Sequence, residues 1–357
     1  MARATTARIH MDALRHNLAR IRSAAPGAKV MAVVKADGYG HGLERVAQAL
    51  AGADAFGVAA LSDAQRLRAA GFSQSIVLLS GFDEANDLAQ LRQLSVATVV
   101  HHPFQFELLA ADSGSPISVW LKMDSGMHRL GFPPERFAEV YRRLQAMPNI
   151  ADDIVCMSHF ASSDEPDNPQ TPRQLACFDG ALPPDASICS LANSAAVLEW
   201  PASHRHWLRA GGALYGLSVA TGMTGSDFGL KPAMTLSTRL ISIQQVAAGE
   251  RVGYAGAYVC PEDMPIGVAA IGYGDGYPRN IRSGTPALLN GLRVPIIGRV
   301  SMDLMTVDLR GQPQAAVGDE LTLWGEGLPV EEIAEADSNI SYELTCSITR
   351  RVRFRED

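Results

Sequence analysis

The stretch Val30-Met-Ala-Val-Val-Lys-Ala-Asp-Gly-Tyr-Gly-His-Gly42 joins an apolar run to a glycine-rich loop, with a single lysine between them. Val30–Val34 is apolar at every position, which is typical of a parallel strand buried on both faces. Lys35 follows directly, and a buried ammonium group is unfavourable unless it has a partner or a covalent role. A buried lysine is also neutralised more easily than an exposed one, which suits a nucleophile or a base. The stretch therefore predicts a functional lysine at the end of a buried strand.

The glycines after Lys35 predict a place for an anion. Gly38, Gly40 and Gly42 allow backbone N–H groups to approach a ligand closely. Residues 43–50 predict a helix whose N-terminus would lie beside that ligand. A lysine next to an anion cradle suits a phosphorylated aldehyde cofactor. The alternative is a salt-bridged lysine before an ordinary strand-to-helix turn, and the lysine and glycines alone do not decide between the two.

Length and composition limit the classes of protein to consider. With 357 residues, 47% hydrophobic and 19% charged, the chain has the size and composition of a globular enzyme with two domains. The net charge of −7 disfavours nucleic acid as a partner. No apolar run reaches the roughly 18 residues of a membrane span, and the first residues lack the apolar core of an export signal. We therefore expect a cytoplasmic protein with five reduced, buried cysteines.

Alternating apolar runs and helical patterns predict the first domain. Eight apolar runs lie at residues 30–34, 55–59, 76–79, 96–100, 117–122, 154–158, 188–191 and 207–209. Helical patterns separate most of them, such as 62–70 and 134–147, and another at 12–24 precedes the first run. Eight strands with intervening helices predict a closed (β/α)8 barrel over residues 10–229. An open dinucleotide-binding sheet is the rival fold, but no G-x-G-x-x-G follows the first strand.

A second, mostly β domain is predicted from residue 230 onward. Apolar runs of strand character lie at 235–243, 265–271, 286–289, 292–297, 304–307 and 321–324. Asn290-Gly291 is typical of a type I′ turn, so we expect a hairpin between the two runs that flank it. The domain is predicted to span 230–357 and to include an N-terminal strand at 1–9.

Polar residues gather after the predicted barrel strands, where barrel enzymes have their active sites. They are Lys35 after the first strand, Lys122, Asp124 and Arg129 around the fifth, His159 after the sixth, Asn193 and Ser194 after the seventh, and Arg209 with Gly211 and Gly212 at the eighth. Each has an ordinary alternative, such as a solvated arginine, a hydrogen-bonded core histidine or a serine that caps a helix. Their common position on one rim favours an active site. His101 and His102 lack further ligands, so no metal site is predicted.

The same strings, with others downstream, are similar to those of a known family. VVKADGYGHG, LKMDSGMHRLGF, SHFASSDE, ANSAA, RAGGALYG, VGYAGAY, IGYGDGY and GRVSMD resemble the motifs of the alanine racemases and occur in that family's order. The resemblance covers nearly the whole chain. It implies a pyridoxal 5′-phosphate (PLP) enzyme of fold type III that interconverts L- and D-alanine. It also implies a homodimer in which each active site takes residues from both subunits.

The resemblance implies a role for each matching residue of the barrel. Lys35 would carry PLP covalently and act as one base, and His159 would connect the second base to Arg209 at the pyridine nitrogen. The phosphate would be held by Tyr39, Ser194 and the backbone N–H groups of Gly211 and Gly212.

Five further residues would complete the site by the same resemblance. Arg129 and the backbone of Met302 would bind the substrate carboxylate, Tyr254 of the other subunit would be the second base, and Tyr273 would narrow the entrance. Lys122 resembles the family's carbamylated lysine, which orients the carboxylate-binding arginine. The sequence leaves open whether Lys122 itself is modified.

Three positions depart from the family's pattern. Ala255 stands where a glycine usually follows the catalytic tyrosine, and Ala210 stands where the family often has a proline after the arginine of the eighth strand. Arg350 stands near the place where some members have a tyrosine that reaches the phosphate, so that contact is not expected here.

These roles agree with the chemistry of racemisation. One base must remove the proton from Cα and another must return it on the opposite face. Lys35 is released when substrate takes its place on PLP, so it serves one face. A tyrosine ionises only near pH ~10, so Tyr254 needs a polar partner to serve the other. Arg209 does not donate a proton to the ring nitrogen, which favours proton return over decarboxylation or transamination.

Other functions are less consistent with these residues. A racemase of the same fold for another small amino acid, such as serine, stays open. A decarboxylase is disfavoured by Arg209, and a non-enzymatic PLP-carrying protein is disfavoured by the second domain with its Tyr254. The sequence leaves open whether D-alanine is made for peptidoglycan or degraded.

Overall fold

The computed structural model describes residues 4–357, which form two compact units. The barrel unit comprises residues 15–214 and 219–223, and the β unit comprises the chain up to residue 14 together with 215–218 and 224–357. The N-terminal strand predicted within residues 1–9 is observed at Thr6–Ile9, and residues 1–3 lie outside the described part of the chain.

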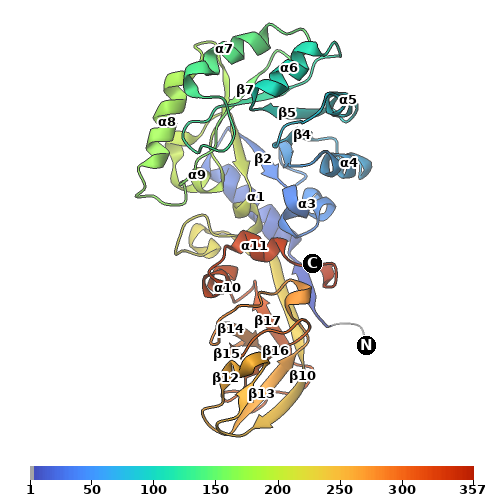
Figure 1. Cartoon of the computed structure of the whole chain (residues 1–357), viewed down its shortest axis with the longest axis vertical. Coiled ribbons are helices and arrows are strands. Elements are labelled where there is room, and N and C mark those ends of the chain that lie inside the picture. The colour runs from blue at the N-terminus through green and yellow to red at the C-terminus, as the bar shows by residue number, and fades with distance from the viewer. Residues whose placement is uncertain (1–3) are drawn as a thin grey trace. The chain divides into compact units, whose positions relative to one another are not determined.

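The barrel unit contains eight parallel strands that close on themselves. Some of them are labelled in Figure 1. The strands are β2 (Lys29–Val33), β3 (Ala55–Val58), β4 (Ser75–Leu78), β5 (Val96–Val100), β6 (Val119–Lys122), β7 (Val155–Met157), β8 (Ile188–Ser190) and β9 (Trp207–Ala210). Strand β2 pairs with β9 in parallel, with Met31 opposite Arg209, and this pairing closes the ring. The predicted (β/α)8 barrel is confirmed.

Helices lie between the barrel strands and cover them. They are α1 (Met11–Ala24), α3 (Leu43–Ala49), α4 (Leu61–Ala69), α5 (Ala85–Gln93), α6 (Pro103–Ala111), α7 (Pro134–Gln145), α8 (Gln170–Ala181) and α9 (Ser194–Glu199). Helix α7 illustrates why these segments are helical, because a proline lies in its first turn and its apolar residues recur at helical spacing. Phe137, Val140, Tyr141 and Leu144 are buried as that spacing predicts.

The inside of the barrel is filled with side chains. Met31, Ala55, Val77, Val99, Trp120, Val155 and Met157 form one buried cluster. The Trp120 and Trp207 rings pack with centroids 5.6 Å apart. A packed interior leaves the carboxyl rim of the strands as the place where the barrel can bind a ligand.

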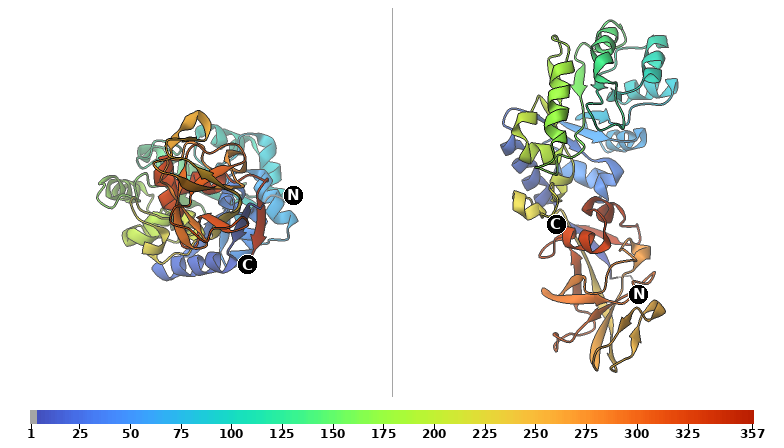
Figure 2. Two further views of the ribbon diagram at one scale, coloured as in Figure 1. Left: turned by 90° about the horizontal axis from the view of Figure 1, so that it is seen from below. Right: turned by 60° about the vertical axis from the view of Figure 1, so that its left-hand side comes forward.

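The β unit is built on an eight-stranded sheet in the order β13-β16-β15-β14-β17-β10-β1-β18, whose strands can be followed in Figure 2. They are β1 (Thr6–Ile9), β10 (Met234–Val246), β13 (Met264–Ala269), β14 (Pro286–Leu289), β15 (Leu292–Ile297), β16 (Met305–Asp308), β17 (Glu320–Trp324) and β18 (Arg353–Glu356). Asn290 and Gly291 both have positive φ, 49° and 83°, which is the backbone of the expected type I′ turn. The mostly β second unit is confirmed.

Helices α10 (Val330–Asp337) and α11 (Ser341–Cys346) and the strand that follows them, β18, had no sequence prediction. Strand β1 lies between β10 and β18, antiparallel to the first and parallel to the second. This position ties the start of the chain to its end within one sheet.

Two expectations about composition have mixed outcomes. Within residues 4–357, no helix is both long and apolar enough to cross a membrane. All five cysteines are free thiols, but only Cys156, Cys189 and Cys260 are buried, and Cys346 is exposed. The expectation that all five are buried is therefore wrong, because α11 presents Cys346 to solvent.

Candidate active site

The residues after β2 form a left-handed turn. Ala36, Asp37, Gly38 and Tyr39 all have φ between 53° and 63°. Non-glycine residues in this region cost roughly 1–2 kcal/mol each. The turn directs Tyr39 back toward strand β9, because a Cβ placed on Gly211 would lie 2.6 Å from the Tyr39 hydroxyl. The glycine-rich string thus serves to place a tyrosine hydroxyl at the rim.

The first turn of α3 already has an acidic partner. The Asp37 carboxylate accepts the N–H of Leu43 at 3.1 Å. Arg66 pairs with this carboxylate and with Glu44, so one guanidinium compensates both negative charges. The Leu43 N–H is therefore engaged within the chain, and the anion cradle at this loop stays a prediction.

Lys35 lies at the rim and is exposed, so the predicted burial of its side chain is wrong. The strand ends at Val33 and the left-handed turn begins at once, which leaves the lysine outside the packed interior. Four cations lie close together here, because the charges of Lys35, Arg129 and Arg209 add to burial in lowering the pKa of the fourth, Lys122. This concentration of positive charge, in a chain of net charge −7, favours an anionic ligand.

Arg209 is held rigidly by the ends of the neighbouring strands. Its Nη1 donates to the Ser190 carbonyl at 2.9 Å and to the Ser190 hydroxyl at 2.6 Å. Its Nη2 donates to the carbonyls of Ser158 at 2.5 Å and Leu191 at 3.0 Å. Burial lowers the Arg209 pKa to about 10, so the guanidinium stays charged at pH 7. Within residues 4–357 its Nε–H has no acceptor, which leaves one directed donor for a ligand.

His159 is connected to Arg209 and is neutral. Its Nδ1 lies 3.3 Å from Arg209 Nη2. An arginine only donates, so Nδ1 is the acceptor and Nε2 carries the proton. Burial of the ring, and then the charges of Arg209 and Lys122, lower the His159 pKa well below its usual value. The Nε2–H is therefore available as a donor over the physiological range.

Ser194, Gly211 and Tyr39 form a cradle at the ends of β8 and β9. The Ser194 hydroxyl oxygen accepts the N–H of Gly211 at 2.8 Å and that of Ala213 at 3.2 Å. Its own proton is then left to donate. Asn193 caps α9 by accepting the N–H of Ala196, so the serine is not the helix cap. These hydrogen bonds exclude helix capping, which was the ordinary alternative for Ser194.

Lys122 and Arg129 lie on one hairpin-like loop after β6. Phe132 N–H donates to the Lys122 carbonyl and Asp124 N–H donates to the Phe132 carbonyl, which closes the loop. Lys122 is 7% exposed, and Arg129 is exposed. Among residues 4–357 neither side chain forms a salt bridge, although the Asp124 carboxylate is near enough to oppose the lowering of the Lys122 pKa. The pair therefore combines a buried cation lacking a counter-ion with an arginine open to a ligand carboxylate.

Three of the predicted residues belong to the β unit and come from neighbouring loops. A Cβ on Gly253 would lie 3.4 Å from Arg299 N, and the Tyr273 N–H donates to the Ser301 carbonyl at 3.0 Å. Tyr254 is 68% exposed and Met302 is 52% exposed. The Met302 N–H has no acceptor within residues 4–357. The β unit thus presents an exposed tyrosine, Tyr254, and an unpaired backbone donor, the Met302 N–H.

Ala255, next to Tyr254, has a φ of 59°, where glycine would be less strained. The departure from the family's pattern therefore leaves the backbone in the left-handed form that glycine normally takes. A side chain at this position costs about 1 kcal/mol and does not reverse the turn.

Sequence reasoning missed the groups that hold Arg209 and His159. Ser158 and Ser190 act mainly through their carbonyls, and Gln174 of α8 donates to the His159 carbonyl at 2.9 Å. Backbone acceptors carry no residue-type signature, so the sequence offered no signal for them. Among residues 4–357, no group of three His, Cys, Asp or Glu side chains is arranged to hold a metal ion.

Comparison with known proteins gives matches along nearly the whole chain. Residues 9–219 match the family model described as alanine racemase, N-terminal domain, and residues 233–355 match that of the C-terminal domain. The alanine racemase of Shewanella sediminis is 52% identical over 347 residues, 97% of each chain. That of Nitrosococcus oceani is 51% identical over 345 residues, 96% of this chain and 97% of its own.

Solved structures agree with the sequence relatives. The biosynthetic alanine racemase from Pseudomonas aeruginosa superposes with a TM-score of 0.97 at 44% identity, covering 99% of each chain. The alanine racemase from E. faecalis gives a TM-score of 0.91 at 32% identity, covering 99% of this chain and 98% of its own. Because the two family models together run from residue 9 to residue 355, the chain belongs to the alanine racemase family.

Proposed function

We propose that this chain is an alanine racemase that interconverts L- and D-alanine with PLP. The observation that carries the proposal is the fixed Arg209, whose single remaining donor lies on the same rim as the Ser194 cradle and Lys35. An anionic cofactor with one aromatic nitrogen matches this set of groups better than a dinucleotide or a metal. We propose the cytoplasm as its location, since the free thiols suit a reducing compartment.

The residues fit PLP at each of its polar ends. The Ser194 and Tyr39 hydroxyls and the Gly212 N–H would hold the phosphate, and the Gly211 N–H, which donates to the Ser194 hydroxyl at 2.8 Å, would orient that serine toward it. The Arg209 Nε–H would donate to the ring nitrogen, and Lys35 would bind the aldehyde covalently. When bound, PLP supplies an electron-withdrawing ring that makes the Cα proton of an amino acid removable.

The chain's own residues then bind the substrate and move the proton. The Arg129 guanidinium and the Met302 N–H would hold the carboxylate, which fixes the orientation of Cα. The Lys35 amine would exchange the proton on one face, and the Tyr254 hydroxyl would exchange it on the other. Arg209 carries a permanent charge and donates no proton to the ring, so return of the proton to Cα is favoured.

We further propose a homodimer with shared active sites. Tyr254, Tyr273, Met302 and Leu304 are large side chains that the β unit leaves exposed, at 68%, 38%, 52% and 39%. Exposed apolar groups clustered on loops are typical of a surface that another protein covers. A second copy of this chain would bring its barrel rim to these residues.

The relative from Pseudomonas aeruginosa is a biosynthetic alanine racemase, which supports the proposal that this chain supplies D-alanine for peptidoglycan. Serine remains the alternative substrate. A racemisation assay with L-alanine and with L-serine distinguishes the two substrates.

The proposed function is tested with the purified chain. The chain has only four lysines, Lys29, Lys35, Lys122 and Lys231, so peptide mapping is simple. We expect D-alanine to form from L-alanine, and borohydride reduction to fix PLP to Lys35. Absence of D-alanine formation by PLP-loaded protein would count against the racemase, and a label on another lysine would count against the role of Lys35.

Lys122 is predicted to be carbamylated. Burial, and then the charges of Arg209 and Arg129, lower the Lys122 pKa to about 8. About one tenth of such an amine is neutral at pH 7, compared with about one in several thousand for an ordinary lysine. The neutral nitrogen adds to CO2, forms an N–C bond and loses one proton. The product is an anion that neutralises the surrounding arginines.

Carbamylation should therefore increase as the pH rises through about 8. We expect one carbamate resonance in ¹³C NMR after equilibration with ¹³C-bicarbonate, stronger at pH ~8.5 than at pH ~6.5. It should vanish in Lys122→Met and persist in Lys29→Met, which replaces an exposed lysine. Persistence of the resonance in Lys122→Met refutes the assignment.

A further inference from the structure

Two loops of the β unit lie in direct contact beside Met302 and Tyr273. We define the Tyr273 loop as residues 272–276 and the Met302 loop as residues 301–304. The Tyr273 N–H donates to the Ser301 carbonyl at 3.0 Å, and the Gly274 N–H donates to the Met302 carbonyl at 2.9 Å. A Cβ on Gly272 would overlap Ser301 and lie 2.5 Å from the Met302 carbonyl oxygen. The contact therefore requires glycine at this position.

Arg351 reaches both loops with one guanidinium group. Its Nε lies 3.4 Å from Asp275 Oδ1 in the Tyr273 loop, and its Nη2 pairs with Asp303 in the Met302 loop. Asp275 is fully buried, whereas the Asp303 side chain is 54% exposed. The planar fork of an arginine spans two carboxylates in a fixed geometry that a lysine cannot reproduce.

The segment that carries Arg351 is itself fastened to the Tyr273 loop. Thr349 N–H donates to the Asp275 carbonyl at 3.1 Å, and the Thr349 hydroxyl donates to the Gly274 carbonyl at 3.1 Å. The Asp275 carboxylate in turn accepts the Gly272 N–H at 3.0 Å. Arg351 is thus the side chain that connects this fastened segment to the Met302 loop.

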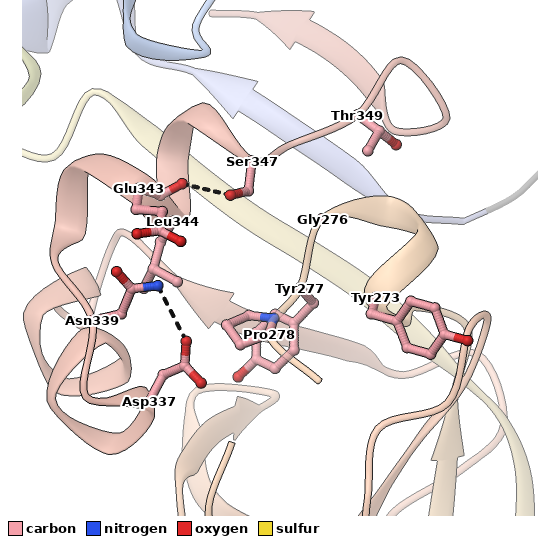
Figure 3. Close-up of a pocket in the computed structure, with 10 residues that line it drawn as sticks. All are labelled: Tyr273, Gly276, Tyr277, Pro278, Asp337, Asn339, Glu343, Leu344, Ser347 and Thr349. Carbon is pink, nitrogen blue, oxygen red and sulfur yellow. Dashed lines mark hydrogen bonds between the residues drawn. The ribbon is translucent and has the colours of Figure 1, made fainter. Parts of the chain in front are cut away.

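The Tyr273 side chain is directed by the same loop. In Figure 3 its ring points away from Asp337, Asn339 and Glu343, the acidic side of the pocket that Tyr273 borders. Thr349 lies on the far side of the loop from these residues in the same view. The Tyr273 ring therefore leaves the loop on the side opposite to those three residues.

We propose that Arg351 is a positioning residue for substrate recognition. By joining Asp275 to Asp303, Arg351 fixes the position of the Met302 N–H relative to the Tyr273 ring. The donor to the substrate carboxylate is then fixed relative to the side chain that limits substrate size. This inference rests on the proposed function, because it assigns these two groups to substrate binding. Arg351 itself touches neither substrate nor cofactor in this account.

The test compares Arg351→Met with Arg310→Met. Arg310 is a matched control in the same unit, because it also joins a buried aspartate, Asp308, to an exposed glutamate, Glu262. We expect Arg351→Met to raise KM for L-alanine about tenfold with a much smaller change in kcat, since the lost interaction is uniform binding of the carboxylate. Discrimination against L-serine should fall as the Tyr273 loop loosens. Arg310→Met should leave both values unchanged.

Hydrogen exchange gives a second readout that is independent of activity. The Tyr273 and Gly274 amides should exchange faster in Arg351→Met and not in Arg310→Met. Arg351→Lys should rescue only part of both effects, and Gly274→Ala should reproduce them, because its Cβ would overlap the Arg351 guanidinium. If Arg351→Met does not fold, Asp303→Asn removes the exposed half of the bridge and carries the same test.

Equal KM, equal selectivity and equal exchange in Arg351→Met and Arg310→Met would overturn the proposal. Loss of stability with unchanged KM in the folded fraction would also overturn it. If the wild-type chain does not racemise alanine, the proposed function fails, while the exchange data still decide whether Arg351 joins the two loops.

Discussion

Replacing Tyr254 by phenylalanine should abolish proton exchange from L-alanine and preserve it from D-alanine. The substitution removes the hydroxyl and keeps the ring, so PLP binding should survive. Racemisation should fall by roughly 10²–10⁴-fold or more, the usual contribution of a positioned general base. The resemblance to the family assigns the proton of L-alanine to Tyr254 and that of D-alanine to Lys35, so Lys35 would still remove the Cα proton of bound D-alanine. Deuterium incorporation in D₂O, followed separately for each enantiomer by NMR, measures this asymmetry.

Tyr258→Phe is the matched control for that experiment. Tyr258 lies on β12 (Tyr258–Val259), directly opposite Val252, and its hydroxyl is 4.0 Å from the Met264 sulfur. The Tyr258→Phe protein should exchange the Cα proton of both enantiomers at wild-type rates. If a folded, PLP-loaded Tyr254→Phe protein loses exchange from both enantiomers equally, the two-base assignment is refuted.

Mixing two inactive variants should restore activity. Lys35→Ala removes the lysine from the barrel unit, and Tyr254→Phe removes the hydroxyl from the β unit. If each site takes its lysine from one chain and its tyrosine from the other, a heterodimer has one intact site and one doubly altered site. An equal mixture with random exchange should recover about a quarter of wild-type activity, since half of the dimers are heterodimers.

The alternative is a site that takes both residues from one chain, and mixing then restores nothing. Subunit exchange must be verified independently, for example by mass spectrometry of differently labelled chains. Activity that stays at the level of the separate variants after verified exchange rules out shared sites of this kind.

The parts of the fold that were predictable are those with a local signature. Strand β5 was predicted to the residue, because Val96–Val100 is an apolar run that Ser95 and His101 bound. The pairing of β1 with β18 was not predictable, since it joins residues about 350 positions apart and depends on the completed sheet. Helix α11 was missed because its six residues are too few to show a helical period.

The candidate site shows the same division between residue types and geometry. Lys35 and Arg209 could be selected from sequence because a charge at the end of an apolar strand is unusual. The prediction that the Lys35 side chain is buried was wrong, because no sequence signal indicates that Ala36 and Asp37 adopt positive φ. The glycines of the loop after Lys35 were visible in the sequence, but the contact of Asp37 to the Leu43 N–H was not.

The pairing of β1 with β18 also determines the order in which a nascent chain can complete its two units. The barrel strands end at Ala210, so the ribosome has delivered the whole barrel while β18 is still unsynthesised. At about 5–20 residues per second, the remaining residues take on the order of 10 s. During that interval β1 lacks its β18 partner, although β10 is made before β18, and the sheet of the β unit has a high contact order that slows its closure. The surface that carries Tyr254 is thus completed last, so chains acquire the second base, and the ability to pair, only after their cofactor-binding rim has formed.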